Sequence, residues 1–88
     1  MKAHEIDPAK MTGEELTRVA KAMECTAKSE LLDAHFERNH DKIANLAGAC
    51  ALFGIAAMGE CIDHDERADA FTKAMEHMIL AGVGKEDR

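Results

Sequence analysis

Hydrophobic residues recur every three or four positions across the first half of the chain, which is the period of an α-helix with one buried face. The apolar positions are Leu16, Ala20, Met23, Ala27, Leu31 and Ala34, with Val19 widening the stripe. Thr12 and Glu15 stand just before the stripe with the spacing of a capping box. The pattern therefore predicts a long first helix over residues 13–38, with residues 1–11 forming an N-terminal turn.

Residues 43–59 contain no charge, and only Asn45 carries a polar side chain. The segment predicts a second helix over residues 41–60. Its expected core-facing positions are Ile43, Leu46, Ala47, Cys50, Phe53, Ala57 and Cys61, and a second apolar face carries Ala44, Ala51, Leu52, Ile55 and Met58. A helix that is apolar nearly all round is buried on several sides.

An 88-residue chain offers little material to cover such a helix. We therefore expect self-association, with an interface made by Gly48, Ala51, Leu52, Ile55 and Met58. Small residues four apart, as in the pairs Ala44/Gly48 and Cys50/Gly54, allow another helix to approach closely.

A break between the first two helices is expected at residues 39–41, because Asn39 tolerates the left-handed conformation and Asp41 is a good cap. A bend in one continuous helix is the alternative. Asp63 and Glu66 then resemble a capping box that opens a third helix over residues 64–81.

The third helix has its own apolar stripe and stop signal. Phe71, Ala74, Met75 and Met78 form the stripe, and residues 82–84 carry the glycines of a Schellman motif. Residues 85–88 are a charged tail. Each predicted helix holds one phenylalanine (Phe36, Phe53, Phe71), expected to be one core aromatic apiece. The sequence thus predicts a single all-α domain over residues 1–88, a three-helix protomer packed into a homo-oligomeric helical bundle.

Composition and charge narrow the classes of partner. The chain has 17 acidic and 11 basic residues and a net charge of −6, which disfavours binding to DNA or RNA duplexes. Three cysteines within helices, an odd number, fit reduced thiols in the cytoplasm. The charge-free segment is at the lower edge of transmembrane length, but its alanine and glycine content drives insertion weakly. We expect a cytoplasmic protein that does not enter the membrane.

Two pairs of side chains have the spacing of metal ligands. Glu37 and His40 could share one helical face, and Cys61 and His64 have two-ligand zinc spacing. Neither pair has the matching second pair that such sites use. The cysteines lack an accompanying glycine-rich elbow or oxyanion site. We therefore expect no metal, no cofactor, no catalytic residue and no enzymatic activity.

The segment of residues 43–81 resembles the helical-hairpin family of phage anti-CBASS proteins, which sequester cyclic oligonucleotide signals. The resemblance is carried by Cys61, Glu66, Arg67, Ala70, Thr72, Met78 and Ala81. The chain departs from that pattern in lacking a proline after Cys61 and in having Leu80 where a tryptophan is usual. The turn over residues 63–69 is also similar to that of small RNA-binding four-helix dimers, a similarity that shared capping chemistry explains.

The resemblance implies a phage protein that binds small anionic nucleotides at protomer junctions without hydrolysing them. Arg67 and Thr72 are then the residues implied to contact the ligand. From composition and pattern alone, the favoured hypothesis is a stoichiometric protein-interaction or inhibitor module that acts on a protein partner. Nucleotide sequestration is the alternative.

Overall fold

Three α-helices follow one another in the computed structural model, which describes residues 7–58 and 63–83. α1 spans Gly13–Glu37, α2 spans His40–Met58 and α3 spans His64–Leu80, and a 3-10 turn, η2 (Pro8–Lys10), precedes them. No strand occurs in these two ranges, so the predicted all-α class is confirmed. The predicted helix bounds agree to within one or two residues, although residues 59 and 60 of the second helix lie outside the described ranges.

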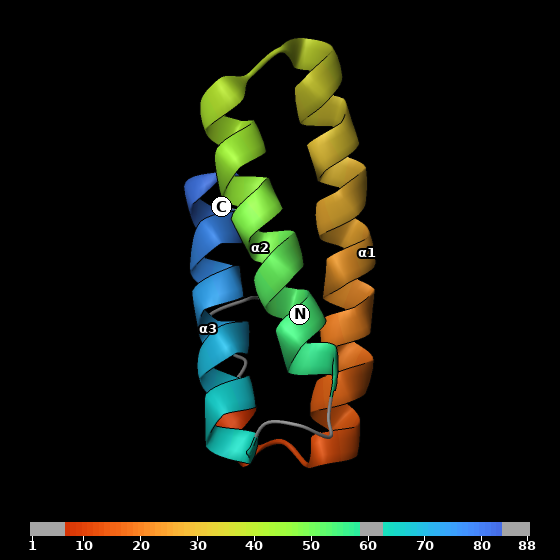
Figure 1. Cartoon of the computed structure of the whole chain (residues 1–88), viewed down its shortest axis with the longest axis vertical. Helices are drawn as coiled ribbons and strands as arrows, with labels where there is room; N and C mark the ends of the chain where they lie inside the picture. The colour runs from red at the N-terminus through yellow and green to blue at the C-terminus, as the bar shows by residue number, and fades with distance from the viewer. Residues whose placement is uncertain (1–6, 59–62, 84–88) are drawn as a thin grey trace.

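α2 is the central helix of the protomer. It packs along α1 on one side and α3 on the other, whereas α1 and α3 touch each other only slightly. Figure 1 shows α1 and α3 running antiparallel to α2. η2 packs against α3, with Pro8 buried. The extents of the protomer are 36 × 29 × 16 Å, which makes it flat. Among the residues that the structure describes, α1 and α3 are the helices that pack on α2.

α1 begins with the predicted capping box. The Thr12 hydroxyl accepts a hydrogen bond from the Glu15 backbone N–H at 3.1 Å, and Glu15 Oε1 accepts one from the Thr12 N–H at 2.9 Å. The hydrogen bond from the Thr12 backbone, followed by that with its side chain, lowers the pKa of the Glu15 carboxyl group. These contacts satisfy two N–H groups that the first turn of a helix leaves unpaired.

The connection between α1 and α2 is a true break, and the sequence prediction assigned its residues wrongly. Arg38, not Asn39, takes the left-handed conformation, with φ of 58°. Asn39 then caps α2 in place of Asp41: its Oδ1 accepts from the Lys42 N–H at 3.2 Å, and its carbonyl accepts from the Ile43 N–H at 2.9 Å. Both residue types suit these roles, and the short connection shifts the cap by two positions.

α3 begins and ends as predicted. The Asp63 Oδ1 accepts a hydrogen bond from the Glu66 N–H at 3.0 Å. At the other end, Val83 N–H donates to the Met78 carbonyl and Gly82 N–H donates to the Ile79 carbonyl. Gly82 has φ of 89°, a conformation that glycine adopts without strain. This is the hydrogen-bond pattern of a Schellman motif.

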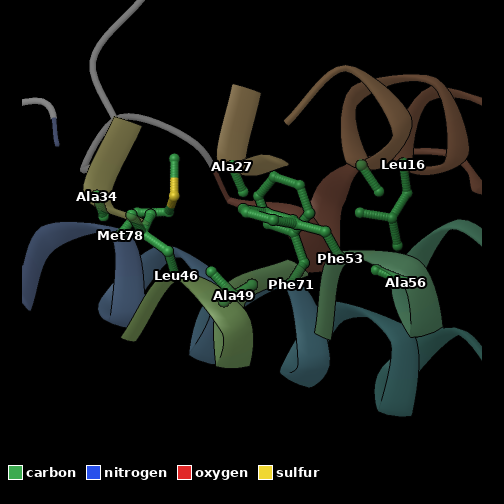
Figure 2. Close-up of a cluster of buried hydrophobic side chains, with 11 residues drawn as sticks. Leu16, Ala27, Ala34, Leu46, Ala49, Phe53, Ala56, Phe71 and Met78 are labelled. Carbon is green, nitrogen blue, oxygen red and sulfur yellow. The ribbon is translucent and has the colours of Figure 1, made fainter. Parts of the chain in front are cut away.

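The core lies where all three helices converge (Figure 2). At its centre the rings of Phe53 and Phe71 meet edge to face, with centroids 5.3 Å apart and planes at 72°. Such pairs contribute about 0.5–1.5 kcal/mol beyond the burial of their surface. The remaining buried members are mostly small: Leu16, Ala20, Ala27, Ala34, Leu46, Ala49, Ala56, Ala74 and Met78. The alanines allow the helices to lie close together.

Two predictions about the core were wrong. Phe36 is 81% exposed on the outside of α1, because it lies opposite the predicted stripe of that helix. α2 buries Ala49 and Ala56 while Ala47 is exposed. The other described members of the predicted core-facing set agree with the structure: Leu46 and Phe53 are buried, and Ile43, Cys50 and Ala57 pack against the core. A helix that is apolar nearly all round shows little contrast between faces, so positions at the edge of its buried face are hard to assign.

The left-handed Arg38 gives a test of the α1–α2 connection. We expect Arg38→Gly to stabilise the protein by about 1 kcal/mol, because glycine avoids the Cβ clash of this conformation. For a domain of this size the melting temperature should rise by roughly 4–8 °C. Arg38→Ala is the matched control and should give no such gain; equal melting temperatures for the two variants would contradict the assignment. Circular dichroism during heating measures both.

Candidate functional site

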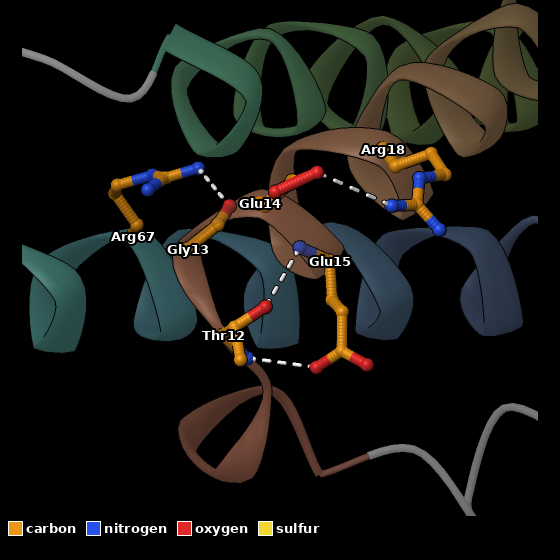
Figure 3. A network of polar contacts seen from close by, with 6 residues as sticks. All are labelled: Thr12, Gly13, Glu14, Glu15, Arg18 and Arg67. Carbon is orange, nitrogen blue, oxygen red and sulfur yellow. Dashed lines mark hydrogen bonds and ion pairs between the residues drawn. The ribbon is translucent and has the colours of Figure 1, made fainter.

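Arg67, in the first turn of α3, is buried between the three helices with 5% of its surface exposed. Its Nε donates to the Ala56 carbonyl of α2 at 3.0 Å. Its Nη2 donates to the Gly13 carbonyl at 3.4 Å and also to the Thr17 hydroxyl, both in α1. Figure 3 shows the guanidinium beside the start of α1. One side chain therefore joins α3 to both other helices.

Helix ends explain why a buried guanidinium fits here. The Ala56 carbonyl lies in the last turn of α2, where carbonyls lack partners within the helix and the helix dipole is negative. The first turn of α1 is the unfavourable, positive end of a dipole, but Glu14 and Glu15 place two carboxylates there. Burying an arginine is costly unless its donors are satisfied, and these acceptors reduce that cost.

Beside Arg67 lies an open cleft of about 610 Å³. Its lining residues are Gly13, Glu14, Thr17, Arg18, Lys21, Met58 and Arg67. Three of them are cationic and one is acidic, the reverse of the balance in the whole chain. Arg18 and Glu14 face each other with Nη2 and Oε1 3.7 Å apart on exposed side chains, a weak ion pair.

Of the two residues implied to contact a ligand, only Arg67 lines this cleft. Thr72 is exposed on α3, and its hydroxyl donates to the Ala68 carbonyl of the same helix at 3.0 Å. That is the common local bond of a helical threonine. The structure does not bring Arg67 and Thr72 together.

The residues predicted to form an oligomer interface divide into two groups. Ala51, Ile55 and Met58 are exposed, and Met58 keeps 59% of its surface open to solvent. Leu52 is half-buried against the core. Gly48 lies under the ring of His77 from α3, since a Cβ at position 48 would be 3.4 Å from Nε2. Gly48 thus serves the contact of α2 with α3 inside the protomer.

The exposed group continues along α2. Ala44, Ala47, Ala51, Ile55 and Met58 are spaced three or four residues apart, so they share one face, and all five are exposed. We name this face the α2 stripe. By length and composition α2 is also the one helix in the described ranges that could span a membrane, and only 22% of its apolar window is buried.

Of the two candidate metal pairs, only Glu37 and His40 lie wholly within the described residues, and they form no metal site there. The left-handed Arg38 separates Glu37 at the end of α1 from His40 at the start of α2. Cys61 lies outside the described residues, so its pairing with His64 is not described. Within residues 7–58 and 63–83, no three histidine, cysteine or acidic side chains gather closely enough to hold a metal ion.

The environment of the Cys50 thiol does not favour its thiolate form. Burial of the Cys50 thiol, followed by the nearby Glu24 carboxylate, raises its pKa above the usual value, whereas a reactive thiolate needs a lowered one. Cys25 is exposed on the outer surface of α1.

Sequence reasoning missed all the cleft residues that α1 contributes, among them the polar Glu14, Thr17, Arg18 and Lys21. They stand on the polar side of the predicted first helix, where charged residues are ordinary. Their partner Arg67 is 50 residues from Thr17 in the chain. Only the packing of α3 onto the start of α1 reveals that they share a site.

No protein-family model, curated protein or solved structure matches the chain.

The contacts of Arg67 predict a large effect on stability. Arg67→Met should destabilise the protein by about 2 kcal/mol, because it removes the charge-assisted hydrogen bonds to α1 and α2. Arg18→Met, the matched control in the same cleft, should change stability by less than about 0.5 kcal/mol, since its ion pair is exposed. Urea denaturation followed by circular dichroism measures both; equal midpoints would show that Arg67 does not fasten the helices.

Proposed function

We propose that this protein is a small non-enzymatic binding protein that acts stoichiometrically and associates through the α2 stripe. The first occupant of the stripe is a second copy of the chain, which places the protein in a homo-oligomeric helical bundle. The observation that supports this proposal is the exposure of one whole face of the most apolar helix.

The dimensions and composition of the stripe suit another helix. From Ala44 to Met58 it extends about 21 Å at 1.5 Å per residue, close to four helical turns. Three of its five members are alanine, which allows two helix axes to lie close together. Ile55 and Met58 supply larger apolar contacts, and methionine adapts to irregular surfaces.

The charge of the chain also favours a second copy. Each protomer carries a net charge of −6, so most pairs of surfaces would bring carboxylates together. The stripe belongs to a charge-free segment and avoids this repulsion. Identical apolar surfaces related by a two-fold axis complement one another, which is the usual arrangement of homodimers.

A second exposed apolar surface favours protein interaction as the role of the assembly. Leu32 and Phe36 lie one turn apart on α1 and are 58% and 81% exposed. Aromatic residues are enriched in protein interfaces. This supports an interaction or inhibitor module that binds a protein partner.

Sequestration of small anionic nucleotides is the second candidate function. It requires cationic side chains in a cavity, and the cleft beside Arg67 provides them with a volume in the usual range of ligand sites. Isothermal titration calorimetry with a panel of cyclic dinucleotides and trinucleotides tests it. Submicromolar binding supports the candidate, and no heat across the panel excludes it.

A charge in the α2 stripe tests self-association. Ala51 is exposed in the protomer, so Ala51→Glu should leave the fold intact but place a carboxylate in the interface, where burial is costly. We expect the wild-type protein to be at least dimeric at micromolar concentration and the variant to be monomeric in multi-angle light scattering. Ala22→Glu, on the exposed side of α1, is the matched control and should keep the wild-type mass.

Two results would contradict the proposal. One is a monomeric wild-type protein, and the other is an Ala51→Glu variant with the wild-type mass. A lipid bilayer is the rival occupant of the α2 stripe, and flotation with phosphatidylcholine vesicles tests it. If a monomeric wild-type protein floats with the vesicles and the Ala51→Glu variant does not, the stripe binds lipid instead of a second copy.

A further inference from the structure

The cleft beside Arg67 concentrates positive charge on an acidic protein. Arg18, Lys21 and Arg67 line it, and Glu14 is the one acidic residue of the lining. Arg18 and Lys21 lie three residues apart on α1, so they share a face, while Arg67 approaches from α3. Cationic side chains from two helices thus border one open volume.

The Arg67 side chain is held in one orientation by its hydrogen bonds to α1 and α2. Its Nε and Nη2 are held by acceptors on α2 and α1, which leaves its Nη1 toward the side of Gly13. The protein has therefore already met the conformational cost of ordering this long side chain. A guanidinium held in this way binds an oxyanion with little further loss of entropy.

The cationic groups of the cleft have few charged partners. Arg67 and Lys21 make no ion pair with another side chain in residues 7–58 and 63–83. Arg18 has only the weak pair with Glu14. The lining therefore keeps excess positive charge, which is stabilised when an anion enters.

From this arrangement we infer that the cleft binds a phosphate-bearing small molecule, with Arg18, Lys21 and Arg67 facing the phosphate oxygens. A volume of about 610 Å³ exceeds the needs of a single inorganic ion and fits a small organic phosphate. Glu14 forms an ion pair with Arg18, so its carboxylate would compete with a bound anion for the Arg18 guanidinium. Phosphate binding in this cleft rests on the second candidate function, and it is independent of self-association through the α2 stripe.

Inorganic pyrophosphate is the probe that tests the site, because it carries the phosphate chemistry and nothing else. We expect its addition at low ionic strength to shift the backbone amide resonances of residues 13–21 in ¹H–¹⁵N NMR spectra. Lys21→Gln should weaken binding by roughly tenfold, the loss of one charge-assisted contact. Glu14→Gln should strengthen binding, because it removes the competing carboxylate.

Lys73→Gln is the matched control, since Lys73 is an exposed lysine on α3 that pairs with Asp69 outside the cleft. It should bind pyrophosphate as the wild type does. The inference is overturned if neither the wild type nor Glu14→Gln responds, or if Lys73→Gln is weakened as much as Lys21→Gln. Binding of pyrophosphate without binding of any cyclic nucleotide would keep the cleft as a phosphate site while excluding nucleotide sequestration.

Discussion

One packing constraint governs this molecule: a helix that is apolar nearly all round is covered by only two others. α1 and α3 flank α2, and each contributes the residues of its single apolar stripe to one core that the three helices share. This core forms around Phe53 and Phe71. The side of α2 opposite the core keeps its apolar residues in the open, and the flat shape of the protomer follows from the same arrangement.

Arg67 completes this packing at the end where α1 starts and α2 finishes. Small alanines dominate the core, so each helix contact buries modest apolar area. A guanidinium that donates to the Ala56 carbonyl, the Gly13 carbonyl and the Thr17 hydroxyl adds polar contacts with defined directions. Such contacts fix the relative positions of the three helices. Contacts among small apolar side chains constrain these positions only weakly.

Local chemistry made much of the fold predictable from sequence. The Thr12 capping box and the Gly82 Schellman motif depend on residues a few positions apart, and both form as expected. The outward position of Phe36 also follows from the helical period, because residue 36 lies opposite the apolar stripe of α1. The wrong expectation came from assuming that a phenylalanine is buried. The face that α2 buries was predicted at its centre, Leu46 and Phe53, but not at Ala47, Ala49 and Ala56, because the helix has no charged side to mark the edge of the buried face.

The candidate site was less predictable for a related reason. The sequence resemblance singled out Arg67 but also Thr72, which faces solvent away from the cleft. Arg18 and Lys21 become candidate site residues only because they line the same cleft as Arg67. That proximity depends on how α3 packs against α1. Long-range packing of this kind has no local signature, whereas helix caps and stripes do.

The two proposed surfaces are joined at one residue. Met58 ends the α2 stripe and also lines the cleft. A second copy seated on the stripe would cover Met58 and alter that wall of the cleft, so protein association and anion binding would act on the same side chain. Thermodynamic linkage then requires reciprocity: if association changes the affinity for an anion, the anion changes the affinity of association by the same factor. A ligand in the cleft would in this way influence association without any chemical step, because a change at Met58 alters the surface that a second copy would meet.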